Sequence, residues 1–276
     1  MLADDQRFDV RHLDIIGVDG SPVEGWFLGP AGADGPVPTL LSCHGGPHAA
    51  WGHVFSFDNW MFAAAGYGTL LVNQRGSTGY SQAFAECVHG DFGNLDFFDV
   101  MAGVDLAVRL GLADPDRLGV WGISAGAFLT TWAITHSDRF RAAVVESPLL
   151  DWSAMLGADV GMGVSPMGGR DTWARDRVLP AVRGALADNL RRQCTTPLLI
   201  IQHEMDLRTP PANADQMYAL LKLHGQTVEM LRMPRTPHAG SIELGDPATR
   251  LAQNEALIEW MGKFVIGDRA PAGAES

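Results

Sequence analysis

The sequence predicts an α/β fold in which helices cover both faces of a mostly parallel central sheet. Three observations predict it: short segments made almost entirely of apolar residues, segments with apolar residues at helical spacing, and regular alternation of the two kinds. Short, wholly apolar strands are typical of parallel sheets, whose strands are buried on both faces. At 276 residues the chain has room for one such domain with a full core, and not for a second of similar size.

The first predicted element is residues 23–28, a short apolar segment whose valine, tryptophan and phenylalanine favour a strand. After a glycine turn, an apolar run ends at a glycine cluster, as a strand does when it delivers a loop to the edge of a sheet. A helical segment, another apolar strand and a long segment with helical spacing follow. In order, these elements are strand 23–28, turn 32–35, strand 39–43, helix 59–65, strand 69–72 and helix 95–110.

The second half of the chain continues the alternation. Further short apolar runs predict strands, and the longer segments around them predict helices. In order, these elements are strand 118–121, helix 127–136, strand 142–145, strand 198–201, helix 212–224, strand 228–231 and helix 251–264.

Residues 150–193 interrupt this order, because they lack a strand pattern and begin with many glycines. We interpret them as an excursion over the active site, a loop followed by one or two helices within residues 177–192. Residues 1–266 are therefore predicted to form a single domain. Residues 267–276 are small and polar, which predicts a disordered tail.

The composition disfavours several classes of partner. Twenty basic against 32 acidic residues give a net charge of −12, so we expect neither nucleic acid nor a membrane as a partner. The three cysteines are far apart and odd in number, which predicts no disulfide framework and fits a cytoplasmic location. The charged start of the chain predicts no signal peptide, and no apolar stretch approaches the roughly 18 residues of a membrane span. We expect no metal and no cofactor, because four histidines lack the spacing of a metal site: His44, His48, His53 and His89.

Residues 122–126 read Gly-Ile-Ser-Ala-Gly, between a predicted strand and a predicted helix. A serine on such a sharp turn is the nucleophile elbow of α/β-hydrolases. The flanking glycines are needed because the turn leaves no room for side chains. Ser124 is therefore the candidate nucleophile, and the chemistry it indicates is acyl transfer through a serine ester.

A serine nucleophile needs a base and a carboxylate that orients the base. Ligands bind at the carboxyl ends of the strands, and in this fold the acid precedes the base in the chain. Asp206 follows the predicted strand at 198–201 and His238 follows the next one. Glu204 is a rival acid. His203 and His224 are rival bases, but one precedes the acid and the other ends a helix.

An oxyanion hole needs two backbone donors. One is the N–H of Ala125, which follows the nucleophile. The other should come from the loop at residues 44–47, His-Gly-Gly-Pro, where glycine lets the backbone approach the substrate oxygen.

Five motifs together resemble the prolyl oligopeptidase family of serine peptidases, nearest its acylaminoacyl-peptidase branch. They occur in family order, and the resemblance spans about residues 14–264. The motifs are His-Gly-Gly-Pro-His at 44–48, Asn-Gln-Arg-Gly-Ser-Thr-Gly-Tyr at 73–80, Gly-Ile-Ser-Ala-Gly at 122–126, Asp-Leu-Arg-Thr-Pro at 206–210 and His-Ala-Gly at 238–240.

The resemblance implies a triad of Ser124, Asp206 and His238. It also implies oxyanion donors at the Ala125 amide and in the 44–46 loop. In acylaminoacyl peptidases the loop donor is the amide at the position of Gly46, whereas other relatives use a tyrosine hydroxyl at the position of His44. The resemblance further implies a set of substrate-binding residues, an arginine that holds a substrate carbonyl and four pocket residues: Arg208, Leu149, Trp152, Met155 and Thr209. Core packing is the alternative role for Trp152 and Met155.

The sequence departs from the family pattern in three places. Ala125 and Ala127 stand where the family has a large residue and a second glycine, which should widen the pocket or change its preference. Glu204 follows His203 where glycine is commoner, which alters the loop conformation. Only about 35 residues precede the first core strand, fewer than one propeller blade of roughly 40 residues. We therefore expect no β-propeller, and a homo-oligomer could supply a substitute gate.

The leading hypothesis is a serine hydrolase that cleaves an amide bond of a short or N-blocked peptide through an acyl-enzyme. A second hypothesis keeps the chemistry and changes the substrate: an esterase, a thioesterase or an acyl-transferring cyclase acting on a small metabolite. A third is a non-catalytic binding module that has kept the fold. The intact serine, aspartate and histidine argue against the third.

Overall fold

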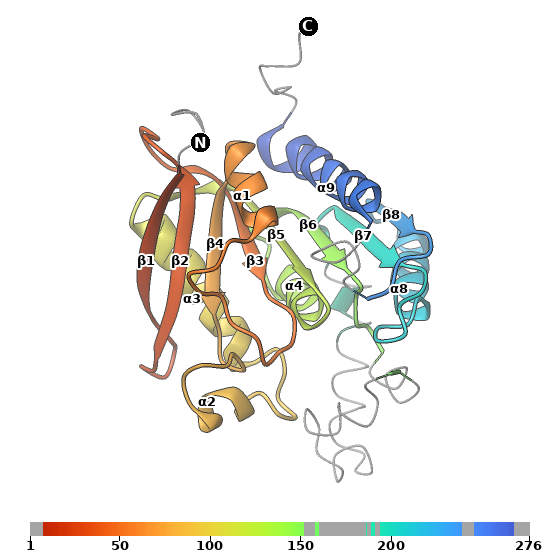
Figure 1. The fold of residues 1–276 in the computed structure, drawn as a ribbon, viewed down its shortest axis with the longest axis horizontal. Helices are drawn as coiled ribbons and strands as arrows, with labels where there is room; N and C mark the ends of the chain where they lie inside the picture. Colours follow the sequence, from red (N-terminus) through yellow and green to blue (C-terminus); the bar gives the residue numbers. More distant parts are fainter. Residues whose placement is uncertain are drawn as a thin grey trace, which may run out of the picture.

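The computed structural model describes residues 8–151, 158–159, 186, 189–190, 194–238 and 246–267. These residues form an eight-stranded sheet in the order β1-β2-β4-β3-β5-β6-β7-β8 (Figure 1). Strand β2 pairs antiparallel with β1 and β4, and all other neighbours are parallel. The strands are β1 (Phe8–Ile16), β2 (Pro22–Pro30), β3 (Val37–Cys43), β4 (Gly68–Asn73), β5 (Ala113–Ile123), β6 (Phe140–Glu146), β7 (Leu198–His203) and β8 (Val228–Met233).

Helices lie on both faces of the sheet. The helices are α1 (Phe57–Ala64), α2 (Gln82–Glu86), α3 (Leu95–Arg109), α4 (Ala125–His136), α8 (Ala212–Leu223) and α9 (Pro247–Met261), which continues as a π-helical segment, Gly262–Ile266. Asp246 caps α9 by accepting the Thr249 amide at 3.3 Å. The mostly parallel sheet with helices on both faces confirms the predicted fold class.

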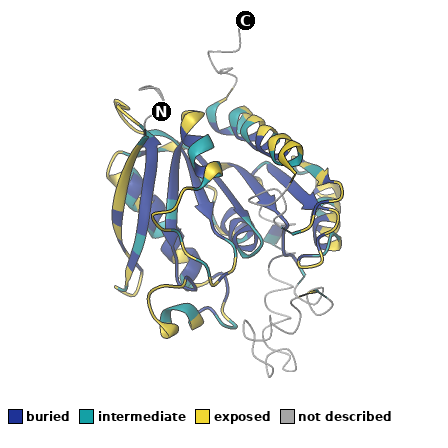
Figure 2. Cartoon of the chain, viewed as in Figure 1, coloured by how far each residue is buried: buried dark blue, intermediate teal, exposed yellow. Residues whose placement is uncertain are grey.

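Two apolar cores fill the space between the sheet and its helices. One joins the sheet to α3, α4 and α8, and the other joins it to α1 and α9. Neighbouring strand residues contribute to opposite cores, as Leu40 and Leu41 do, because successive side chains of a strand point to opposite faces. The central strands are therefore buried over most of their length (Figure 2), which is why their buried parts are largely apolar in sequence.

The structure contains two elements that the sequence did not predict. The first strand predicted from the sequence begins at residue 23, and the structure adds β1 before it. Strand β1 lies at the edge of the sheet, so most of its side chains are exposed, and only Leu13 and Ile15 are buried. Because the exposed positions of β1 include charged residues, the segment lacks the apolar run that indicated the other strands. The short helix α2 was also missed, and it has no buried residue.

Most of the predicted excursion at residues 150–193 lies outside the described residues, and so does the tail from residue 268. Of the positions that are described there, Leu186 and Leu190 are buried in the larger core. The Asp159 amide donates to the Leu207 carbonyl at 2.9 Å, so this part of the excursion contacts the loop after β7. Within the described ranges, no helix is long and apolar enough to cross a membrane.

Candidate active site

Ser124 lies on the turn between β5 and α4, as the elbow motif predicts. Its φ is 58° and its ψ is −120°, a conformation that costs a residue with a Cβ on the order of 1–3 kcal/mol. Backbone hydrogen bonds of the Ser124 amide and carbonyl hold this conformation. The Ser124 amide donates to the Glu146 carbonyl at 2.9 Å, and its carbonyl accepts the Phe128 amide at 3.1 Å. The strained turn is thus fixed to β6 and to the first turn of α4.

The two glycines of the elbow allow an unusually close approach of backbone segments. A Cβ on Gly126 would lie 2.0 Å from the Cys43 carbonyl oxygen, and one on Gly122 would lie 2.5 Å from the Gly126 backbone. No side chain fits at these separations. The glycines therefore press the elbow against the end of β3, where the His-Gly-Gly-Pro loop begins.

Replacing Gly126 by alanine should destabilise the fold and disturb the site together. The added methyl group would force the β3 end and the elbow apart, and overpacking of this kind costs about 3 kcal/mol or more when only backbone can yield. Urea unfolding followed by circular dichroism measures the loss. Gly52→Ala is the matched control, because a Cβ there meets nothing within 4 Å. A Gly126→Ala chain as stable as that control would contradict the close packing described above.

Asp206 and His238 form the ion pair that the sequence predicts for the acid and the base. His238 Nδ1 lies 2.8 Å from Asp206 Oδ2. Asp206 follows β7 and His238 follows β8, and both strands are parallel to β5 through β6. All three triad candidates therefore lie beyond the same edge of the sheet. The hydrogen bonds of the described residues include none between Ser124 Oγ and His238, a contact that often tightens only when substrate binds.

The Asp206 carboxylate is buried and saturated with donors. Its side chain is 0% exposed, and Oδ1 accepts the amides of Arg208 and Thr209, each at 2.8 Å. The Thr209 hydroxyl donates to Oδ2 at 2.9 Å. Burial raises the pKa of Asp206, but the hydrogen bond and the charge of His238, together with hydrogen bonds from Ser147 and Thr209, lower the pKa from 3.8 to about 2. Asp206 is therefore ionised at neutral pH and holds the imidazole through Nδ1.

The rival acid and bases lie elsewhere. Glu204 is exposed, and its amide donates to the Met233 carbonyl at 3.0 Å. His224 is an exposed residue at the end of α8. His203 is fully buried, and burial lowers the pKa of its imidazole. Among the candidate acids and bases, Asp206 and His238 are the two whose described side chains contact each other.

The loop after β3 lies against the nucleophile. A Cβ on Gly45 would lie 3.5 Å from Ser124 Cβ, and Gly46 has a φ of 121°, which favours glycine. Ala125 is the first residue of α4, and the first amides of a helix have no carbonyl partner in their own helix. The loop that contains Gly46 and the first turn of α4, which begins at Ala125, therefore both lie next to Ser124. The His44 side chain instead contacts Ser77 Oγ at 2.9 Å and is 6% exposed.

The predicted substrate-binding residues lie in different surroundings in the structure. Arg208 is exposed, and its guanidinium pairs with Asp159 at 3.3 Å. Thr209 is 1% exposed and its hydroxyl contacts the acid and the base, so its described contacts lie within the triad and not with a substrate pocket. Leu149 is buried in the larger core. Trp152 and Met155 lie outside the described residues.

The sequence analysis also missed some contributors to the site. The Thr209 hydroxyl bond to Asp206 was not foreseen, although Asp-x-x-Thr spacing could have suggested it. Glu146 was not singled out, because the predicted strand ends at residue 145. No local pattern in the sequence marks it.

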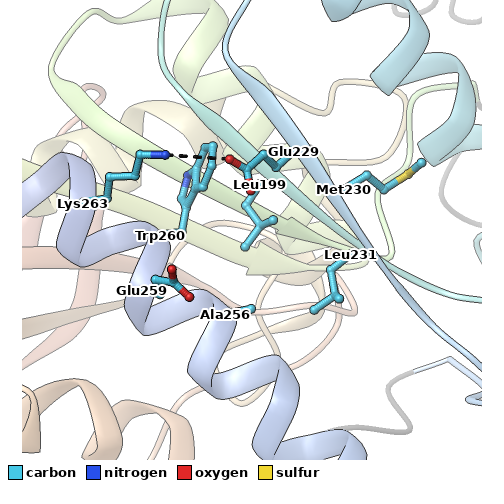
Figure 3. A pocket seen from close by; sticks show the side chains of 8 residues that line it. All are labelled: Leu199, Glu229, Met230, Leu231, Ala256, Glu259, Trp260 and Lys263. Atoms are coloured by element: carbon cyan, nitrogen blue, oxygen red, sulfur yellow. Dashed lines mark ion pairs between the residues drawn. The ribbon is translucent and has the colours of Figure 1, made fainter.

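A hollow of about 230 Å³ lies between β7, β8 and α9, away from the triad (Figure 3). Leu199 and Trp260 line it, and Lys263 pairs with Glu229 across it at 3.8 Å. It contacts the starts of β7 and β8, whereas Asp206 and His238 follow the ends of these strands. In the described part of the chain, no cluster of three or more potential metal ligands occurs.

Comparison with known proteins finds one family and several relatives. Residues 53–266 match the model of the prolyl oligopeptidase family. The chain is 35% identical over 251 residues to the uncharacterized peptidase YuxL of Bacillus subtilis, covering 90% of this chain and 38% of the relative. It is 30% identical over 244 residues to the acylamino-acid-releasing enzyme of Arabidopsis thaliana, covering 82% of this chain and 30% of the relative.

The fold comparison agrees with the sequence comparison. The structure of the acylaminoacyl peptidase of Pyrococcus horikoshii superposes with a TM-score of 0.86 at 28% identity, covering 97% of this chain and 43% of that one. The chain thus spans 30% to 38% of the length of the two curated relatives and less than half of the solved structure.

Proposed function

Because the chain belongs to the prolyl oligopeptidase family, we propose that it is a serine peptidase that cleaves an amide bond of a short or N-blocked peptide. The observation that carries the proposal is the 2.8 Å contact between His238 Nδ1 and Asp206 Oδ2, at the sheet edge that also carries the Ser124 elbow. Relatives described as an acylaminoacyl peptidase and as an acylamino-acid-releasing enzyme support the choice of substrate class.

In the proposed reaction, Ser124 Oγ attacks the carbonyl carbon of the scissile amide, and His238 Nε2 takes the hydroxyl proton. Asp206 fixes the tautomer of the ring by accepting from Nδ1 and stabilises the imidazolium that forms. The proton then passes from His238 to the leaving amine, which departs and leaves an ester on Ser124. Water, deprotonated by His238, attacks the ester and releases the acid.

The negative charge that develops on the carbonyl oxygen needs donors placed in advance. In this proposal the amides of Ala125 and Gly46 provide them, and the positive end of the α4 dipole lies behind Ala125. A donor of this kind is worth about 10²–10³ in rate. In this proposal Arg208, whose guanidinium pairs with Asp159, binds a further carbonyl of the substrate.

A second candidate function is that of an esterase, thioesterase or acyl-transferring cyclase for a small metabolite. The observation that favours it is Ala125, a small half-buried residue beside the nucleophile where the family has a large one. The two functions share the triad and differ in the bond that is broken.

Turnover of p-nitrophenyl esters and of peptidyl p-nitroanilides, with and without an N-terminal blocking group, tests the proposal. We expect hydrolysis of the anilides, with blocked or short peptides preferred. Ser124→Ala is assayed in parallel to subtract background. Hydrolysis of esters alone across a broad anilide panel would reject the peptidase assignment and favour the second candidate.

We further propose a cytoplasmic setting without nucleic-acid or membrane partners. Support comes from the three cysteines, which are all free thiols, and from the net charge of −12.

A further inference from the structure

A group of buried polar side chains lies next to the acid loop, and the proposed reaction uses none of them. The group is Glu146, His203 and Gln253, which are 1%, 0% and 4% exposed. They come from the end of β6, the end of β7 and the middle of α9. Burying a carboxyl group and an imidazole costs solvation free energy. A group of this kind in the interior therefore calls for an explanation.

Gln253 connects the other two side chains. Its amide nitrogen donates to Glu146 Oε2 at 2.8 Å, and its amide oxygen lies 3.3 Å from His203 Nε2. The second carboxyl oxygen of Glu146, Oε1, lies 3.4 Å from the same ring nitrogen. Because an amide oxygen can only accept, His203 Nε2 carries a proton. The ring is therefore held in one orientation and one tautomer.

The other ring nitrogen of His203 faces the Ser147 hydroxyl, with Nδ1 and Oγ 3.1 Å apart. Burial lowers the pKa of His203. The Ser147 hydroxyl also forms a hydrogen bond with the Asp206 carboxylate, so His203, Ser147 and Asp206 are linked through their side chains. Ser147 itself has a φ of 49°, and its amide donates to the Ile201 carbonyl at 2.8 Å. Strands β6 and β7 are thus joined by side chains at their ends as well as by their backbone ladder.

The backbones of Glu146 and His203 hold the two catalytic turns. The Glu146 carbonyl accepts the Ser124 amide at 2.9 Å, and the His203 carbonyl accepts the Asp206 amide at 3.3 Å. The Gln202 side chain donates to the same His203 carbonyl at 2.9 Å. The side-chain contacts between Glu146, His203 and Gln253 therefore connect the turn of the nucleophile with the turn of the acid.

We propose that Glu146 and His203 are positioning residues that keep the Ser124 turn and the Asp206 turn in a fixed relation across β6 and β7. The inference rests on the proposed function. Neither side chain touches the reacting atoms. Each acts through the residue that its backbone holds, and His203 acts also through the Ser147 hydroxyl, which contacts Asp206. A displacement of about 1 Å in a catalytic site can lower the rate a hundredfold, so a rigid connection between the two turns directly supports catalysis.

The test is Glu146→Gln, a change that keeps the size of the side chain and removes its charge. We expect kcat to fall about tenfold or more on the best ester or anilide, with KM within about twofold of wild type. KM should stay near the wild-type value, because Glu146→Gln changes no residue that is proposed to contact the substrate. His203→Gln should give a similar loss. The double variant should lose little more than either single one, because both changes break the same connection.

Asp96→Asn is the matched control. Asp96, on α3, is another buried carboxyl group and is 4% exposed. It accepts a hydrogen bond from the Gly93 amide at 2.9 Å. The change should lower Tm and leave kcat within about twofold. If Glu146→Gln fails to fold, Gln253→Met removes the 2.8 Å donor to Glu146 from the helix side, and a several-fold fall in kcat with unchanged KM is expected.

Three results would overturn the inference. If wild type turns over and the folded Glu146→Gln or Gln253→Met chain matches its kcat, with only Tm lowered, the group is structural and the proposed function stands. If wild type shows neither turnover nor an adduct with a fluorophosphonate, the proposed function fails and this inference fails with it. Additive losses in the double variant would also contradict a shared connection.

Discussion

Replacing Ser124 by alanine should remove nearly all turnover, on the order of a thousandfold or more, and abolish labelling by a fluorophosphonate. The hydroxyl is the group that forms the acyl-enzyme, and the other triad members have no function without it. The fold should be unaffected, because alanine carries the same Cβ into the strained φ of 58°. We expect the free energy of unfolding to change by about 0.5 kcal/mol or less.

Intact mass after fluorophosphonate treatment, with steady-state turnover, measures this prediction. Wild type should gain a single adduct, and Ser124→Ala should gain none. Ser137→Ala, at the opposite end of α4, is the matched serine control and should behave as wild type. Equal activity of Ser124→Ala and wild type would reject the enzyme assignment and favour the non-catalytic binding module.

Replacing Asp206 by asparagine should lower kcat by about 10⁴-fold, because the structure forces the new amide into the wrong orientation. The amides of Arg208 and Thr209 both donate to Oδ1, so the asparagine oxygen must occupy that position. Its NH2 group then faces His238 Nδ1 and donates to it. The ring keeps its proton on Nε2 and is unable to accept the serine proton.

The same change should reduce the loss in the free energy of unfolding that wild type shows at acid pH. The folded pKa of Asp206 is about 2, below its ordinary 3.8. A carboxyl group whose pKa is lowered by folding stabilises the folded state at pH values above its ordinary pKa. This stabilisation is lost as the pH falls from about 4 through about 2. The difference between the ordinary and the folded-state pKa corresponds to about 2 kcal/mol in the free energy of unfolding at neutral pH. Urea unfolding at several pH values should show this contribution in wild type and not in Asp206→Asn.

Glu204→Gln is the control for both measurements, because Glu204 is an acidic residue two positions away that is exposed. It should keep kcat within about twofold and leave the loss in the free energy of unfolding at acid pH unchanged. A large loss in Glu204→Gln with full activity in Asp206→Asn would exchange the two roles and contradict the acid proposed here.

The placement of the candidate residues could be predicted because the signals for it are local. The Gly-x-Ser-x-Gly turn needs glycines within a few residues of the serine, and a Cβ on Gly126 would lie 2.0 Å from Cys43 O. The acid and base follow short apolar runs, and parallel strands bring their ends to one edge. Strand β1 was missed because an edge strand buries few of its residues and need not be apolar.

The sequence by itself thus determined the fold class, the elbow serine and the order of acid and base, since each depends on spacing along the chain. Only the tertiary structure decided which acid faces His238, that the Thr209 hydroxyl serves the acid, and that Glu146 meets His203, 57 positions later. The physical reason is that these contacts depend on strand order and register. Register is set by packing across the whole sheet, and a change of one residue turns every side chain of a strand to the opposite face.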